Sequence, residues 1–298
     1  MRIVVAGGTG FIGREVVRQL LEQGGDEVIV TTRDPERDLW GGRVRLVQAF
    51  AGDAVSLGRA FMGADVVVHS IQFRNHPVED PSHGWTYLEV DGRGTTVAAA
   101  TAKKLGVRRF VYLSGAGAGQ GRPQPWYRAK DQAEAAIRAT GMEFAFLRPS
   151  WVYGPGDRSM SRFVFFCRRL PLVPVIGDGQ SPVWPLHVAD LARAVVECVS
   201  REELAGRALE VGGPQRLTMD DVVRTISRVL GKRRLILHQP VRLMKLAVWP
   251  MRFLPNPILS PGAVDFVTQV VEMDPRPAAD LLGVSFRRLE DGLRAYVS

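Results

Sequence analysis

The N-terminal stretch "RIVVAGGTGFIG" constrains the fold of this chain more than any other. Arg2–Ala6 is a short run rich in β-branched residues that leads into glycine, which is typical of a buried strand. From Phe11–Gln23 the apolar residues recur at helical spacing. Three glycines, Gly7, Gly10 and Gly13, form the connection and open the helix. The stretch therefore predicts a strand, a tight turn and a helix, which together begin a βαβ unit.

The same alternation of strand and helix patterns continues to residue 150. Four more short apolar runs read as strands: Glu27–Arg33, Ala64–Ser70, Arg109–Ser114 and Glu143–Pro149. Strands that alternate with helices imply parallel pairing, with helices on both faces of the sheet. We therefore expect an α/β fold, a doubly wound parallel sheet of the Rossmann type.

After Pro149 the pattern changes to a glycine- and proline-rich loop, followed by mixed helices and short strands. We expect two units on this basis. Residues 1–150 form the nucleotide-binding domain, to which 184–200 return, and residues 151–298 form a smaller, mixed α/β substrate lobe beside it.

Composition narrows the class of protein. The formal net charge of +8 favours anionic partners, although scattered surface arginines explain it equally well. Two isolated cysteines, with no cluster of metal-ligand spacing, favour a cytoplasmic protein without a metal site. No motif supports nucleic-acid binding. The apolar segment 241–259 is broken by charges and prolines, so it is not an ordinary membrane-spanning helix. It either lies shallowly in a membrane interface or closes the substrate pocket.

The glycine spacing and its position after a strand match a dinucleotide-binding turn, in which the backbone approaches a pyrophosphate at a helix N-terminus. The second strand ends in Thr31, Thr32 and Arg33, where NAD-binding proteins carry an acid. Arginine pairs with phosphate, so we expect NADP(H) rather than NAD(H). Asp53 either borders the adenine or forms a turn.

The motifs "GGTGFIG", "VYLS", "RPSWVYGPGD" and "PLHVADLA" occur in an order and spacing that resemble the short-chain dehydrogenase/reductase superfamily, in its extended and atypical branches. The resemblance covers nearly the whole chain. The segments "YRAKDQAEAAIRATG" and "DLLGVSFRRLEDGLRAYV" are most similar to the complex I accessory subunits and NmrA-like proteins of this superfamily. The resemblance implies NAD(P)H binding without requiring a dehydrogenase reaction.

In active members of the family a tyrosine transfers a proton, and a lysine four residues later holds the nicotinamide ribose. Lys130 matches the lysine, but the tyrosine position falls on Trp126 and the Ser/Thr position on Ala116. Tyr127 is three residues before Lys130, so the two share a helix face, with the tyrosine rotated by about 100° from the usual site. We interpret this as a remodelled site with candidate catalytic residues Lys130 and Tyr127. Asp91 stands where many members carry asparagine, which puts their proton relay in doubt.

The resemblance also implies that Pro149, Ser150 and Val152 lie along the nicotinamide carboxamide, that Tyr153 and Asp157 reach the substrate, and that His187 and Asp190 tie the substrate loop to the main domain. The candidate cofactor contacts are Gly7, Thr9, Gly10, Phe11, Ile12, Gly13, Arg33, Asp53, Ser70, Ser114, Lys130, Pro149 and Val152.

Three functions remain open from the sequence. The first is an NADP(H)-dependent oxidoreductase of an apolar carbonyl- or quinone-like substrate. Its cleft would be lined by Trp85, Trp126, Trp151, Phe163, Phe165 and Phe166. The second is a non-catalytic protein that holds NADPH for structure or redox sensing. The third, a sugar-nucleotide epimerase or dehydratase, suffers most from the missing tyrosine, because oxidation of a sugar hydroxyl needs a base.

Overall fold

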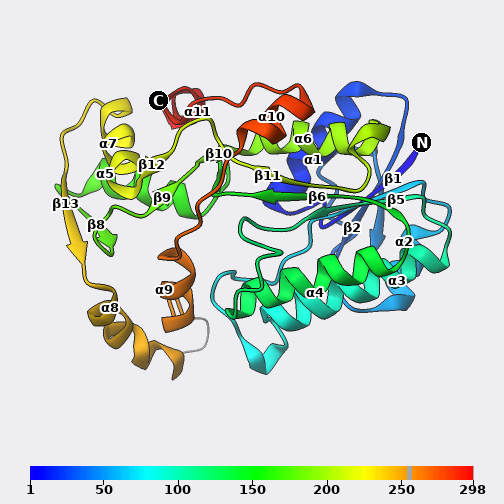
Figure 1. Cartoon of the computed structure of the whole chain (residues 1–298), viewed down its shortest axis with the longest axis horizontal. Coiled ribbons are helices and arrows are strands. Elements are labelled where there is room, and N and C mark those ends of the chain that lie inside the picture. The colour runs from blue at the N-terminus through cyan, green and yellow to red at the C-terminus, as the bar shows by residue number, and fades with distance from the viewer. Residues whose placement is uncertain (254–256, 298) are drawn as a thin grey trace.

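Seven parallel strands form the central sheet of this computed structural model, which describes residues 1–253 and 257–297 (Figure 1). In spatial order they are β11 (Arg207–Val211), β6 (Glu143–Pro149), β5 (Arg109–Leu113), β4 (Val66–His69), β1 (Arg2–Ala6), β2 (Glu27–Thr32) and β3 (Arg45–Gln48). The strand order reverses between β1 and β4. The chain leaves β1 toward α1 on one face and leaves β4 toward α3 on the other, and in doubly wound sheets ligands bind in the crevice at this point.

Helices cover both faces of the sheet, as the sequence predicts. One face carries α1 (Phe11–Gln23), α6 (Val188–Ser200) and α10 (Arg276–Leu282). The other carries α2 (Ala54–Phe61), α3 (Thr95–Lys104) and α4 (Pro125–Ala139). A π-helical segment, η2 (Tyr87–Gly94), runs directly into α3. The Rossmann-type α/β prediction is therefore confirmed.

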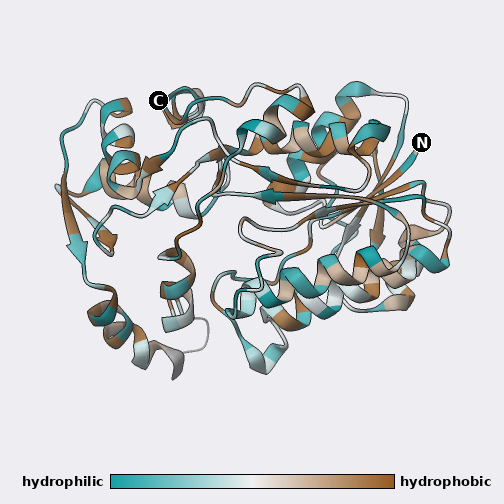
Figure 2. Cartoon of the chain, in the orientation of Figure 1, coloured by the Kyte–Doolittle hydropathy of each residue, from teal (hydrophilic) through white to brown (hydrophobic). Residues whose placement is uncertain are grey.

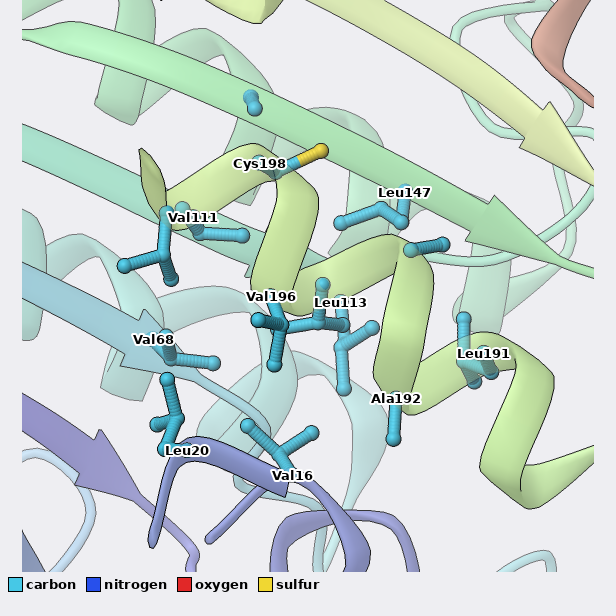
Figure 3. Packing of buried hydrophobic residues seen from close by; sticks show 14 of the residues in the cluster. Val16, Leu20, Val68, Val111, Leu113, Leu147, Leu191, Ala192, Val196 and Cys198 are labelled. Atoms are coloured by element: carbon cyan, nitrogen blue, oxygen red, sulfur yellow. The ribbon is translucent and has the colours of Figure 1, made fainter. Parts of the chain in front are cut away.

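The two cores follow from the alternation of side chains along each strand. Ile3 and Val5 of β1 face α1 and α6, whereas Val4 and Ala6 face the opposite helices. Figure 3 shows the first core, in which Val16 and Leu20 of α1 and Val196 of α6 meet over the strands. Both sides of each central strand are buried, which explains why these strands read as continuous apolar runs.

The C-terminal part of the chain is shared between the sheet and the lobe. β11 lies within the range 151–298 expected for the lobe, yet it pairs with β6 at one edge of the main sheet. α6 falls within the returning segment 184–200, and α10 also packs on the sheet. The sequence "ALEVGG" predicts a strand here but contains nothing that assigns it to a particular sheet.

The lobe has a core of its own, built from α5 (Ser159–Arg169), α7 (Met219–Val229), α11 (Leu289–Val297) and the parallel pair β8 (Leu172–Ile176) and β13 (Leu235–Gln239). Thr218 caps α7 in a reciprocal capping box with Asp221. Short pairs β7 (Val152–Tyr153) with β10 (Leu186–His187), and β9 (Pro182–Val183) with β12 (Leu217–Thr218), connect the lobe to the sheet.

Beyond β13 the chain forms α8 (Val241–Val248), the 3₁₀ helix η4 (Trp249–Phe253) and α9 (Pro261–Val267). The remaining single turns are η1 (Pro81–His83) and η3 (Glu202–Leu204). Of the segment 241–259 singled out from the sequence, residues 254–256 lie outside the described residues. Within the parts of the chain that are described, no helix is long and apolar enough to cross a membrane.

Candidate cofactor and active site

In the loop at the carboxyl end of β1, the glycine positions are those with little room for a side chain. Gly7 has φ of +85°, and a Cβ atom on Gly13 would lie 2.3 Å from the carbonyl oxygen of Gly7. Gly10 is the N-cap of α1 and provides no side chain to satisfy the first amides of the helix. The turn thus presents backbone N–H groups and the positive end of a helix dipole, which is the donor set that a pyrophosphate requires.

Around this loop, Thr9, Gly10, Phe11 and Ile12 are partly or fully exposed at its surface. Ser70, at the end of β4, donates its hydroxyl to the carbonyl oxygen of Ala6 at 2.9 Å. A Cβ atom on Gly7 would lie 3.0 Å from the Ser70 side chain and backbone. The structure therefore brings the predicted loop residues and Ser70 together at the crevice beside β1.

The end of β2 carries no carboxylate at the position that NAD-binding proteins use. Thr31 and Thr32 are buried there, and Thr31 Oγ1 accepts a hydrogen bond from the backbone N–H of Gly7 at 3.1 Å. Arg33 follows and is exposed, and its guanidinium has no carboxylate partner among the described residues. The guanidinium of Arg33 thus follows, two residues later, the threonine that is hydrogen-bonded to the glycine loop.

Asp53 is the N-cap of α2. Its carboxylate oxygens accept hydrogen bonds from the backbone N–H groups of Val55 at 3.1 Å and Ser56 at 3.2 Å. The hydroxyl of Ser56, followed by these backbone N–H groups, holds the pKa of Asp53 below its ordinary value. The carboxylate thus serves the helix, as the turn interpretation expects, and the backbone is the part of Asp53 that remains for contact with an adenine.

Lys130, on α4, makes a buried ion pair with Asp91 on the helical segment before α3. The distance from Nζ to Asp91 Oδ1 is 2.9 Å, and the two side chains are 12% and 0% exposed. Burial alone would lower the pKa of Lys130, but the oxygens of Tyr112 and Asp91 outweigh burial, and the pKa lies above the ordinary lysine value. Lys130 is therefore a fixed cation at neutral pH and a poor proton donor.

Trp126 and Tyr127 begin α4 and share one partner from the far end of the chain. The Nε1–H of Trp126 donates to Gln269 Oε1 at 2.8 Å, and the hydroxyl of Tyr127 donates to the same oxygen at 2.6 Å. The guanidinium of Arg122 donates to the Tyr127 oxygen at 3.2 Å and to the carbonyl oxygen of Val270 at 3.0 Å. Among the described contacts, none joins the Tyr127 hydroxyl to the Lys130 ammonium.

The Tyr127 ring is held as firmly as its hydroxyl. It is 2% exposed, and a Cβ atom on Gly117 would lie 2.7 Å from it. Arg122 and Gln269 are the two functional candidates that sequence reasoning missed. Gln269 lies 142 residues from Tyr127 in the chain, and no motif surrounds it.

A hollow of about 570 Å³ opens beside these residues, between the start of α4, the loop before η2 and the segment that follows α9. Its walls include Glu79, Tyr87, Trp126, Tyr127, Asp265 and Gln269. An aromatic cluster of Phe73, Tyr87, Trp126 and Tyr127, joined by the partly buried Trp85 and Phe266, lies against it. The indole of Trp126, the residue that the family resemblance aligns with the tyrosine position, thus forms part of the wall of this hollow.

The prediction that six aromatic residues line one cleft is wrong. Trp85 and Trp126 belong to the cluster beside the hollow, whereas Trp151, Phe163 and Phe166 pack on the separate core of the lobe, and Phe165 is 56% exposed. Trp151 donates its Nε1–H to Ser159 Oγ, and its ring meets Phe163 edge-on. Composition identifies these rings as apolar contacts but does not say which core each one joins.

Ser114, which directly follows β5, is part of a buried polar cluster. Its hydroxyl donates to Glu134 Oε1 at 2.7 Å, and Arg148 forms two hydrogen bonds to the same carboxylate, at 2.9 and 2.6 Å. Ala116, at the usual Ser/Thr position, donates its backbone N–H to the carbonyl oxygen of Pro149. Pro149 and Val152 lie on β6 and β7, next to that loop.

Tyr153 and Asp157 do not reach toward a substrate, contrary to expectation. Tyr153 is buried, with its hydroxyl directed at the backbone of Leu289, and Asp157 caps α5 by accepting from the N–H of Met160 at 2.6 Å. His187 is the N-cap of α6, and Asp190 forms a salt bridge with Arg287 at 2.8 Å. These four residues organise the junction between lobe and sheet.

Within the described part of the chain, no group of His, Cys, Asp and Glu side chains is arranged to hold a metal ion.

The comparison with known families agrees with the geometry of the glycine loop. Residues 7–202 match the model of a family described as NAD(P)H-binding. The chain belongs to this NAD(P)H-binding family. The resemblance to the atypical branch of the short-chain dehydrogenase/reductase superfamily is confirmed.

Three relatives illustrate the range of the family. The chain is 27% identical over 269 residues to NADH dehydrogenase (ubiquinone) 1 alpha subcomplex subunit 9 of Arabidopsis thaliana, covering 86% of this chain and 65% of that one. It is 27% identical to the ceramide reductase of Caulobacter vibrioides, over 80% of this chain and 73% of that one. It is 28% identical to the (4-alkanoyl-5-oxo-2,5-dihydrofuran-3-yl)methyl phosphate reductase of Streptomyces griseus, over 99% of this chain and 89% of that one.

Solved structures share the whole fold. MoeE5 in complex with UDP-glucose and NAD superimposes with a TM-score of 0.76 at 24% identity, covering 100% of this chain and 97% of that one. The UDP-glucose 4-epimerase of Thermotoga maritima gives a TM-score of 0.75 at 21% identity, with the same coverage. At these identities the likeness concerns the fold alone.

Proposed function

We propose that this protein is an NADP(H)-dependent reductase of an apolar carbonyl- or quinone-like acceptor, working without the family's tyrosine acid. The observation that carries the proposal is that α4 presents a lysine that stays protonated, Lys130, together with an apolar side chain, Trp126, at the tyrosine position. Lys130 is held at the cofactor side of α4 by Asp91, and Trp126 borders the hollow at the tyrosine position. Reductase names among the relatives support the reaction class.

The residues present fit the dinucleotide. Within the Gly7–Gly13 turn, a Cβ atom at Gly8 or Gly13 would lie 2.7 or 2.3 Å from its nearest neighbour, so the backbone packs tightly here, as in a backbone cradle for pyrophosphate. Arg33 is available for the 2′-phosphate that distinguishes NADP(H), and Lys130 for the nicotinamide ribose hydroxyls. When bound, NADPH supplies a hydride. The chain itself contributes binding, orientation and the exclusion of water by the aromatic cluster.

The source of the proton follows from the contacts of the two candidate donors. Lys130 keeps its proton at neutral pH because its pKa is raised, and the Tyr127 hydroxyl is held between Gln269 and Arg122. A conjugated carbonyl or quinone that accepts a hydride takes its proton from water, so such an acceptor suits this site better than a simple ketone. An alcohol substrate would need a base that the site lacks, which disfavours sugar-nucleotide oxidation.

One observation favours a second function, a non-catalytic NADPH-binding protein. Gln269 accepts hydrogen bonds from both Trp126 and Tyr127, so the C-terminal segment closes directly over the start of α4. The similarity to a subunit of mitochondrial NADH dehydrogenase is in line with this alternative. The buried free thiols of Cys167 and Cys198 fit a cytoplasmic setting for either function.

A panel of acceptors separates the two functions. NADPH oxidation is measured with quinones, enals and simple ketones, together with calorimetric binding of NADPH. Turnover of quinones or enals that exceeds turnover of ketones supports the reductase. Tight NADPH binding without turnover of any acceptor supports the binding protein, and no NADPH binding contradicts both.

A further inference from the structure

The positive charge of this chain is concentrated at the outer end of the lobe. Residues 158–177 and 232–264 together contain ten lysines and arginines and no aspartate or glutamate. These two segments build α5, β8, β13, α8 and η4, which lie at the end of the molecule farthest from the main sheet (Figure 1). These ten cations are about a quarter of the 39 lysines and arginines of the chain, and Asp157, Asp178 and Asp265 border the two segments.

The same end of the lobe exposes an apolar sheet face. β8 and β13 pair in parallel with Leu172 opposite Leu235 and Pro174 opposite Leu237, so these four side chains share one face. Val173, Val175 and Ile236 point the other way, into the core of the lobe. On the outer face Leu172 is 39% exposed, Leu235 71% and Leu237 44%.

Helix α8 follows β13 directly in the chain and exposes further leucines at the same end of the molecule. Val248 is buried, whereas Leu243 is 64% exposed and Leu246 71%. Arg242 is exposed beside them, and Lys245 pairs with Asp265 of α9. Trp249, at the start of η4, is 47% exposed. Figure 2 shows hydrophobic ribbon along β8, β13 and α8 at this end of the molecule.

We propose that this surface, formed by β8, β13 and α8, docks on an anionic lipid bilayer. Leucine side chains enter the boundary between head groups and acyl chains, while the surrounding lysines and arginines contact the head groups. A second copy of the chain is a poorer occupant, because an isologous interface through this surface would bring its cations against the same cations of the partner. The inference rests on this surface and is independent of the proposed reaction.

The primary test is sedimentation of the full chain with vesicles. We expect binding to phosphatidylcholine vesicles that contain about 30% phosphatidylglycerol, at least tenfold weaker binding to pure phosphatidylcholine, and weakening by salt. Leu243→Ser/Leu246→Ser should lower the partition coefficient on anionic vesicles by about tenfold or more, because two exposed leucines no longer enter the interface. The matched control is Val55→Ser/Met62→Ser on the main domain, whose side chains are 70% and 64% exposed, and it should bind like the wild type.

Trp249 provides a readout that does not depend on sedimentation. Its fluorescence should shift to the blue on anionic vesicles, and Trp249→Phe should remove most of that shift while binding persists. The proposal is overturned if the wild type ignores anionic vesicles at low salt, or if the leucine variant binds as well as the control. It is also overturned, in favour of self-association, if sedimentation velocity shows a dimer that the leucine variant abolishes.

Discussion

Lys130 Nζ lies 2.9 Å from Asp91 Oδ1, and both side chains are buried beneath the start of α4. The resemblance to the family places Asp91 where many members carry asparagine. Burial raises the pKa of this carboxyl, and the charge of Lys130 opposes that effect. The second oxygen of Asp91 has no hydrogen-bond partner among the described residues. A lysine fixed in this way can hold ribose hydroxyls in place, but it does not readily give up a proton.

The ion pair should be visible in the free energy of unfolding. Asp91→Asn and Lys130→Met should each lower it by about 3–5 kcal/mol, because each leaves a buried group without its charged partner. The double variant should lose less than the sum, with a coupling of about 1 kcal/mol or more. Because the pKa of Lys130 is raised on folding, its contribution is present below its unfolded pKa and lost only as pH rises above about 10.

Urea denaturation of the four proteins measures this coupling. The exposed pair Arg216–Glu272 provides the control cycle, in which Arg216→Met and Glu272→Gln should show no measurable coupling. Lys130→Met should in addition weaken NADPH binding. Additive losses in the Lys130–Asp91 cycle would mean that the buried pair does not act as a unit.

We expect the cofactor preference to depend on Arg33. NADPH should bind at least about tenfold more tightly than NADH, because an exposed guanidinium replaces the carboxylate that ends β2 in NAD-binding proteins. Arg33→Asp should reverse the order. Arg193→Asp, an equal charge change on the exposed side of α6, should leave it unchanged. Calorimetry with both cofactors decides the matter, and equal affinities in the wild type would refute the assignment.

His69, at the end of β4, should make the protein sensitive to acid. It is 1% exposed, its Nε2 lies 3.1 Å from Thr95 Oγ1, and burial together with the charge of Lys130 lowers its pKa to about 3. Because the pKa of His69 is lower in the folded state than in the unfolded state, its contribution to the free energy of unfolding is fully present above a pH of about 6.5. This contribution is lost as the pH falls toward 3. Between these pH values the free energy of unfolding should fall by about 1.4 kcal/mol per pH unit.

The variant His69→Asn isolates this effect. It should be less stable than the wild type at pH 7, and the difference should shrink as pH falls from 6 to 4. Denaturant titrations at these pH values provide the measurement. A difference that stays constant over this range would show that His69 does not titrate between the folded and unfolded states.

The main sheet could be predicted because its signals are local. Arg2–Ala6 and Phe11–Gln23 agree with β1 and α1 to the residue, since β-branched runs and helical spacing are read within a few positions. The glycine turn was found for the same reason. β11 was expected as a strand but not in the main sheet, because pairing with β6 joins segments about 60 residues apart.

The active site was harder to predict because its contacts are not local. Lys130 was found by its four-residue spacing from the tyrosine position, yet its partner Asp91 lies 39 residues away. Gln269, which binds both Trp126 and Tyr127, stands in a segment without a motif. Asp157 was expected to reach the substrate and Asp53 was left open between adenine and turn, and the structure uses both carboxylates at helix starts. Polar residues at helix starts serve both purposes, and sequence alone does not separate them.

The role of Tyr127 is the most direct question about the remodelled site. Its hydroxyl donates to Gln269 Oε1 at 2.6 Å and accepts from Arg122 at 3.2 Å, and no described contact connects it with Lys130. Tyr127→Phe removes the hydroxyl and keeps the buried ring. It should cost about 1 kcal/mol of stability, the usual contribution of a hydrogen bond. If the protein is a reductase, turnover should fall less than about tenfold, below the 10²–10⁴ that a general acid contributes.

Single-turnover rates with NADPH and the best acceptor of the panel measure this effect. Gln269→Leu is the companion variant, because it removes the shared acceptor and leaves the Tyr127 hydroxyl in place. If Tyr127 only anchors the C-terminal segment, both variants should change turnover to a similar, small extent. A loss of a hundredfold or more for Tyr127→Phe alone, at unchanged NADPH affinity, would show that this hydroxyl has taken over the proton transfer. The site would then be a shifted form of the family's tyrosine–lysine pair, and water would not be the proton source.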